Sequence, residues 1–174
     1  MTVLSLARRL LFILALAALM PVGAAHADAI SFLKGLEGNW RGGGTLRGGR
    51  GNRATRVRCT MRNNFAANLR RLTLGGRCAS AQGTRPVRGA LTASRNGRRV
   101  SGSAFRSVPG ARVVSTSTSF RGNRLTISSR LVDRQGRNVR TRATISGGGR
   151  SYRVSVSAND GSGWKSAGSL SFRR

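Results

Sequence analysis

The sequence predicts an all-β fold: a closed antiparallel up-and-down barrel of about ten strands, preceded by a short helical turn. Two observations support this prediction. Turn-forming pairs rich in Gly, Asn, Gln, Asp and Pro recur every 12 to 14 residues from Asn96 onward, a spacing typical of strands joined by hairpins. Between the turns, apolar side chains alternate with basic or hydroxyl side chains, so each strand has one apolar face. A meander leaves two open edges, and closure into a barrel removes them.

The first 27 residues have the organisation of a cleavable signal peptide. They contain a basic start at Arg8 and Arg9, an apolar run from Leu10 to Met20, and the small residues Ala25 and Ala27 before the expected cleavage point. The apolar run is shorter than the roughly 20 residues that a membrane-spanning helix needs. We therefore expect residues 1–27 to be removed, residues 28–174 to form a single barrel domain, and the protein to be periplasmic or secreted, without spanning a membrane after cleavage.

The structural elements follow in order after this segment. Residues 29–36 form an apolar stretch whose large side chains fall on one face of one or two helical turns. Strands are expected between the turn signals, which include Asn63–Asn64, Gln82–Gly83, Asn96–Gly97, Gly122–Asn123, Gln135–Gly136 and Asp160–Gly161. The alternation is clear around residues 57–61, where Val57 and Met61 fall on one face and Arg58 on the other.

Charge indicates which strand face points inward. The chain has 32 Lys and Arg residues but only 4 Asp and Glu residues, for a net charge of +28. An outer-membrane barrel would crowd the arginines into a narrow lumen without counter-charge, at a cost of several kcal/mol per unpaired ion. The opposite orientation leaves the arginines in water and packs the apolar faces together. The sequence therefore predicts a water-soluble barrel.

The chain has two cysteines, Cys59 and Cys78. In an oxidising compartment, an isolated pair most simply forms a structural disulfide. If the two residues lie directly opposite each other on neighbouring strands, the hairpin loop is centred near Asn68 and both cysteines lie on the inward face. The only histidine, His26, belongs to the predicted signal peptide, so we expect no metal site.

The acidic residues do not form a recognisable catalytic set. They are Asp28, Glu37, Asp133 and Asp160, and no histidine follows residue 27. Asp133 and Asp160 stand at turn signals, where an Asp side chain typically accepts a hydrogen bond from the backbone. Paired carboxylates or a Ser/His/Asp arrangement cannot be assembled from this set. We therefore expect neither an enzyme nor a bound cofactor.

The start of the predicted barrel carries a short family-like signature. Gly38 and Trp40 match the G-x-W motif, and the segment resembles the first strand of lipocalins and related calycins. The resemblance implies that Trp40 closes one end of the barrel and that Arg173 or Arg174 packs across its ring. More closely, the chain resembles uncharacterised exported proteins of Gram-negative bacteria through its V-R-C and R-C-A-S segments at residues 57–59 and 77–80. That resemblance implies a calycin-like fold without an assigned activity.

The excess of arginine favours an anionic partner. We predict an anion-binding patch on the outer face of the hairpin that carries the cysteines, formed by Arg56, Arg58, Arg62 and Arg77. For an exported protein, the expected partners are anionic lipid, lipopolysaccharide or acidic polysaccharide, and nucleic acid is not expected. Two alternatives stay open: a lipocalin-like carrier of a small hydrophobic ligand, and a structural envelope protein without a specific ligand.

Overall fold

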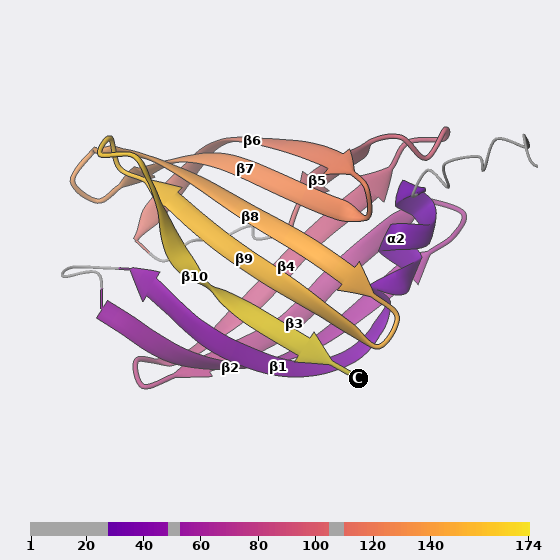
Figure 1. Ribbon diagram of the computed structural model, residues 1–174, viewed down its shortest axis with the longest axis horizontal. Helices are drawn as coiled ribbons and strands as arrows, with labels where there is room; N and C mark the ends of the chain where they lie inside the picture. The colour runs from indigo at the N-terminus through magenta and orange to yellow at the C-terminus, as the bar shows by residue number, and fades with distance from the viewer. Residues whose placement is uncertain (1–27, 49–52, 105–109) are drawn as a thin grey trace, which may run out of the picture.

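A computed structural model describes residues 28–48, 53–104 and 110–174 of the chain. It is an all-β structure of ten antiparallel strands and one short helix, curved into a nearly closed up-and-down barrel (Figure 1). The predicted fold class is therefore confirmed. The predicted signal peptide, residues 1–27, lies outside the described residues. Within the described ranges, no helix is long and apolar enough to cross a membrane.

The elements follow the order expected from the turn signals. The helix comes first, and each strand then pairs with the next through a hairpin, with one exception described below. The bounds are α2 Ala29–Gly35, β1 Gly38–Gly48, β2 Arg53–Ala66, β3 Arg71–Ser80, β4 Gly83–Ala93, β5 Val100–Ser103, β6 Ala111–Arg121, β7 Arg124–Asp133, β8 Asn138–Gly148, β9 Ser151–Asn159 and β10 Trp164–Arg173.

The barrel is joined through its first and last strands. The sheet order is β5-β4-β3-β2-β1-β10-β9-β8-β7-β6, so β1 and β10 are hydrogen-bonded neighbours although they stand at opposite ends of the fold's sequence. The two outermost strands, β5 and β6, meet on the other side of the barrel. In the described part of the chain no backbone ladder joins them, and the Thr118 Oγ1 hydroxyl donates to the Val100 carbonyl across this seam.

The alternation of side chains produces an apolar interior and a basic exterior. In β2 every second residue from Val57 to Asn63 is buried, while the residues between them are exposed. Buried residues also fall at every second position in parts of β7, β8 and β9, at Leu125 and Ile127, at Ala143 and Ile145, and at Tyr152 and Val154. The largest fully buried side chains are Trp40, Leu33, Leu36, Leu72, Leu91 and Leu125. The predicted orientation, with apolar side chains inside and arginines outside, is that of the structure.

Helix α2 covers one end of the barrel (Figure 1). Its apolar face buries Phe32 and Leu33 against the core, and Phe32 packs on the ring of Phe120 at 5.2 Å between centroids. The Asp28 side chain caps the helix by accepting a hydrogen bond from the Ser31 amide. The backbone fixes both ends of the helix to the barrel, through bonds from Ala29 N–H to the Gly97 carbonyl and from Gly149 N–H to the Gly35 carbonyl.

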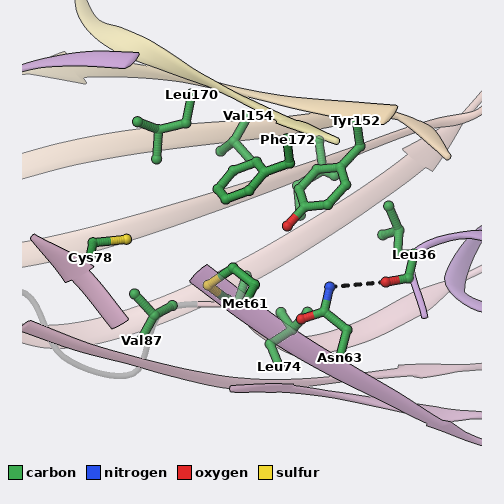
Figure 2. A pocket seen from close by; sticks show the side chains of 12 residues that line it. Leu36, Met61, Asn63, Leu74, Cys78, Val87, Tyr152, Val154, Leu170 and Phe172 are labelled. Atoms are coloured by element: carbon green, nitrogen blue, oxygen red, sulfur yellow. Dashed lines mark hydrogen bonds between the residues drawn. The ribbon is translucent and has the colours of Figure 1, made fainter. Parts of the chain in front are cut away.

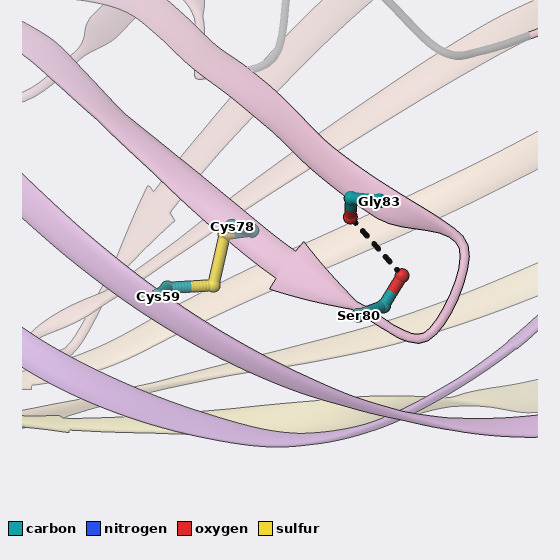
Figure 3. The surroundings of a disulfide bond; sticks show 4 residues. All are labelled: Cys59, Cys78, Ser80 and Gly83. Atoms are coloured by element: carbon teal, nitrogen blue, oxygen red, sulfur yellow. Dashed lines mark hydrogen bonds between the residues drawn. A yellow bond between two sulfur atoms is a disulfide. The ribbon is translucent and has the colours of Figure 1, made fainter.

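The disulfide crosses the hairpin of β2 and β3 (Figure 3). Cys59 lies directly opposite Cys78, with Cα atoms 4.1 Å apart, and the loop between the strands spans residues 67–70. This is the register that the sequence predicts. Cys59 is buried and Cys78 packs against the core from the same inward face. The bond therefore fixes two neighbouring strands from inside the barrel.

Candidate functional site

Trp40 lies at the barrel end that α2 covers. Its side chain is 1% exposed, and its Nε1–H donates to the Leu36 carbonyl at the end of the helix, at 3.0 Å. The ring of Tyr152 meets it edge-on at 4.8 Å between centroids. The Arg174 guanidinium lies over the indole at 4.7 Å and also donates to the Glu37 carbonyl. Of the two arginines that the resemblance offered, Arg174 makes the cation–π contact.

Asn63 is a structural residue that the sequence did not indicate. The Asn63–Asn64 pair is predicted as a turn, but this prediction is wrong because both residues lie inside β2. The Asn63 side chain is 3% exposed, and its Nδ2 donates to the Leu36 carbonyl at 2.9 Å. That carbonyl therefore accepts bonds from both Trp40 and Asn63. Asn63 therefore connects β2 to the end of the helix through the same carbonyl that Trp40 binds.

The barrel interior contains a small apolar cavity beside these residues (Figure 2). The volume of this cavity is about 40 Å³. A dry cavity that accommodates benzene measures about 150 Å³. The Tyr152 hydroxyl points into the cavity, and burial raises the pKa of Tyr152 to about 12 against a smaller opposing effect of Asn63. Among the described residues, this cavity is therefore smaller than one that accommodates benzene.

All four acidic side chains accept hydrogen bonds within the protein. Asp28 caps α2, and Glu37 accepts from the Phe65 amide at 3.4 Å. Asp160 accepts from the Ser162 amide and hydroxyl, and these bonds lower its pKa. Asp133 accepts from the Gln135 and Arg137 amides, and the Arg137 backbone bond lowers its pKa. The two turn aspartates therefore bond the backbone as predicted.

The arginines on the outer faces of the strands form no ion pair within the described residues. In the described part of the chain a single ion pair is found, between Arg137 and Asp133 in the β7–β8 turn. The four predicted patch arginines, Arg56, Arg58, Arg62 and Arg77, are all exposed on the outer face of β2 and β3. Arg58 stands opposite Ala79, and Arg77 stands opposite Thr60, so the arginines alternate across the hairpin with small neutral side chains.

The barrel adds arginines from four other strands to this surface. Arg41 of β1 lies opposite Thr60 and therefore in the same cross-strand row as Arg77. Arg41 also lies directly opposite Arg173 of β10, an arrangement of like charges that costs free energy in a sheet. Arg88 of β4 and Arg153 of β9 extend the surface on either side. We call the outer face formed by these residues the arginine face; its exposed members are Arg41, Arg56, Arg58, Arg62, Arg77, Arg88, Arg153 and Arg173.

A surface groove lies at the centre of the arginine face. Its floor is the glycine segment 42–44 of β1, and Arg41, Arg56 and Arg58 stand at its sides. Gly43 occupies an outward position where other residues of β1 carry a side chain. A Cβ atom at Gly43 would lie 2.3 Å from the Val57 carbonyl oxygen, so the strands can approach this closely because a side chain is missing. The result is a hollow with cationic walls, which we call the glycine groove.

Comparisons with known proteins give a likeness in overall shape. No protein-family model matches the chain, and no curated protein matches it. Among solved structures, the chain is similar to a redesigned β barrel, mFAP1, whose structure was determined bound to DFHBI. The similarity has a TM-score of 0.41 at 12% sequence identity, and covers 85% of this chain and 100% of that chain. The resemblance to lipocalins stays a prediction from the motif formed by Gly38 and Trp40.

Proposed function

We propose that this protein is a non-catalytic binding protein for anionic polymers or headgroups, and that it binds them through the arginine face. One observation carries the proposal: eight exposed arginines share one continuous outer face, while all four acidic side chains accept hydrogen bonds at other positions of the protein. If this surface had no binding partner, the repulsion between Arg41 and the directly opposite Arg173 would only cost free energy of folding. A bound anion would turn that repulsion into attraction.

The glycine groove supplies a place for the anionic group. Neighbouring strands lie about 4.8 Å apart, so Arg41 on β1 and Arg58 on β2 can approach one phosphate or carboxylate from two sides. Guanidinium groups bind such groups in bidentate fashion and keep their charge at any physiological pH. The missing side chain at Gly43 lets the anion approach the sheet between them. Further arginines along the same face would bind successive charges of a polymer.

We infer an extracytoplasmic location for this activity. The support is the disulfide between Cys59 and Cys78, because such bonds persist in oxidising compartments, together with the signal-like sequence of residues 1–27. In that location the available polyanions are lipopolysaccharide, phospholipid headgroups and acidic polysaccharide. All of them present the phosphate or carboxylate groups that the glycine groove suits.

The test compares two variants that lose the same charge. The first replaces four groove and face arginines by glutamine: Arg41, Arg56, Arg58 and Arg77. The control replaces four exposed arginines away from that face: Arg98, Arg99, Arg121 and Arg124. Binding of inorganic polyphosphate, polygalacturonate and phosphatidylglycerol vesicles is measured by titration calorimetry at increasing salt, with circular dichroism to check folding.

We expect the first variant to bind at least about tenfold more weakly than the control variant, which corresponds to about 1.4 kcal/mol. The affinity of the unmodified protein should fall as salt shortens the Debye length from about 10 Å at 0.1 M to about 3 Å at 1 M. Equal losses in the two variants would refute a role for the arginine face. Absence of binding to all three probes at low salt would refute the function itself.

A further inference from the structure

A second surface groove adjoins the glycine groove and has a different chemical character. It runs over β9, β10 and the edge of β1, and Arg47 and Arg153 flank it. Five hydroxyl-bearing side chains line it: Thr45, Ser155, Ser157, Ser166 and Ser169. Thr45 lines both grooves, so the two grooves meet at this residue. We call this second depression the hydroxyl groove.

The shape of the hydroxyl groove depends on an irregularity in β10. The register between β9 and β10 shifts between Ser166 and Gly168, which is the mark of a β-bulge. Gly168 has a φ of +119°, and a Cβ atom there would lie 2.0 Å from the Thr45 carbonyl oxygen. Only glycine fits this backbone without strain. The bulge re-aims the side chains on either side of it, so that Ser166 and Ser169 both line the groove.

The hydroxyl groups are arranged in a row and are free to bind. Thr45, Ser169 and Ser155 lie directly opposite one another on three adjacent strands, at the strand spacing of about 4.8 Å. Ser166 and Ser157 form a second pair beside this row. Within the described residues, none of the five hydroxyls has a hydrogen-bond partner in the protein, and each can both donate and accept.

An exposed aromatic residue stands at the end of the same face. Trp164 is 44% exposed and lies two residues before Ser166 on β10. The Arg142 guanidinium covers its ring at 4.4 Å, and Arg142 itself lies opposite Ser157. Arg140 stands in the next row, opposite Asn159, which pairs with Trp164. Trp164 does not line the groove itself, but its partly open indole lies beyond Ser166 on the same outer face, with cations beside it.

We propose that the hydroxyl groove is a binding site for an acidic polysaccharide, a proposal that rests on the proposed function and names its ligand class. A sugar chain with carboxylate groups presents hydroxyls and anions at close intervals along one molecule. The serine and threonine row would exchange hydrogen bonds with the sugar hydroxyls. Arg47 and Arg153 would bind the carboxylates, and Trp164 would pack on an apolar ring face.

The same surface does not suit a bilayer. A protein that inserts into a membrane interface presents a contiguous apolar face beside its basic residues. Across residues 28–48, 53–104 and 110–174, the large exposed apolar side chains are Leu69, Val114 and Trp164, which stand on separate elements. A polyphosphate would satisfy the arginines, but its oxygens have no hydrogen to give and it would make little use of the indole. A polymer of acidic sugars would bind the arginines, the hydroxyl groups and the indole together.

The test measures two charge-matched probes on three variants. The probes are an oligogalacturonate and an inorganic polyphosphate of equal charge. The groove variants are Ser155→Ala/Ser169→Ala and Trp164→Ala. The control is Ser115→Ala/Ser117→Ala, which removes two exposed hydroxyls from the outer face of β6. Affinities come from calorimetry at one fixed salt concentration. Acrylamide quenching reports Trp164 directly, because the chain's other tryptophan, Trp40, is buried.

The expected result is that each groove variant binds oligogalacturonate about tenfold more weakly but polyphosphate within about twofold of the unmodified protein, while the control variant changes neither. Oligogalacturonate should also protect Trp164 from acrylamide. Equal effects on both probes, or no effect of either groove variant, would overturn the polysaccharide site while leaving the arginine face intact. Phosphatidylglycerol vesicles are titrated into the unmodified protein at the same salt concentration, and tighter binding of these vesicles than of oligogalacturonate would also overturn the polysaccharide site. Failure of both probes to bind the unmodified protein would instead refute the proposed function.

Discussion

Replacing Trp40 by alanine should destabilise the barrel more than any other single aromatic substitution. The indole is 1% exposed, contacts Tyr152 and Arg174, and donates a hydrogen bond to the Leu36 carbonyl. Truncating a buried tryptophan to alanine costs about 3–5 kcal/mol, mostly through the cavity that it leaves. The Leu36 carbonyl keeps its bond from Asn63, so no buried acceptor is orphaned. We therefore expect a loss of about 4 kcal/mol.

Urea denaturation followed by far-ultraviolet circular dichroism measures this loss. For a domain of this size each kcal/mol lowers Tm by about 2–4 °C, so Trp40→Ala should melt about 8–16 °C below the unmodified protein. Trp40→Phe keeps an aromatic ring but loses the Nε1 bond, and should cost about 1–2 kcal/mol. The matched control is Trp164→Ala, which removes an exposed ring and should cost less than about 1 kcal/mol. If Trp40→Ala and Trp164→Ala lowered the free energy of unfolding by the same amount, the interpretation of Trp40 as a buried residue at the barrel end would be refuted.

Two further predictions concern stability. The double variant Cys59→Ala/Cys78→Ala should lower the free energy of unfolding by roughly 3 kcal/mol, because the disulfide joins residues with a sequence separation of 19. A reductant should lower the urea midpoint of the unmodified protein and leave the urea midpoint of the variant unchanged. Tyr152 is the only tyrosine, and its pKa of about 12 in the folded state exceeds the ordinary value of 10.0. The unfolded chain therefore loses the phenol proton first, and stability should fall by about 2–3 kcal/mol as pH rises from about 10 through 12. Phenolate absorbance should follow the same pH range, Tyr152→Phe should lack this loss, and titration of folded Tyr152 near pH 10 would contradict the assigned burial.

The parts of the fold that depend on local pattern were predictable from the sequence. Alternation in segments such as residues 57–61 determines which face of a strand is buried, because a shift of one residue would expose every apolar side chain. The register of β2 and β3 followed from the two cysteines, since one covalent bond aligns a whole hairpin. Asp133 and Asp160 were predictable as turn residues because their partners lie within four residues of them.

The features that depend on distant partners were not predictable in detail. Asn63 looks like a turn residue in the sequence, and its role is visible only when α2 places the Leu36 carbonyl beside it. Barrel closure and strand alternation together indicate that β1 pairs with the last strand. They do not indicate that Arg41 lies opposite Arg173, because that register depends on the path of β10. The bulge at residues 166–168 sets that course, and a lone glycine in a strand indicates a bulge without fixing its position.

The contact between β1 and β10 also determines when the barrel can complete its folding. The ladder from Arg41 to Leu46 must wait for residues 168–173, so it carries the largest loop-closure cost of any strand pair in the sheet. Until then the chain can form two separate arms, β1–β5 and β6–β10, from local hairpins. The unpaired edges of β1 and β10 would invite association between such partly folded chains. Because the faces beside those edges carry arginines and almost no acids, neighbouring chains repel one another, and the same charge that we assign to ligand binding keeps folding intermediates apart.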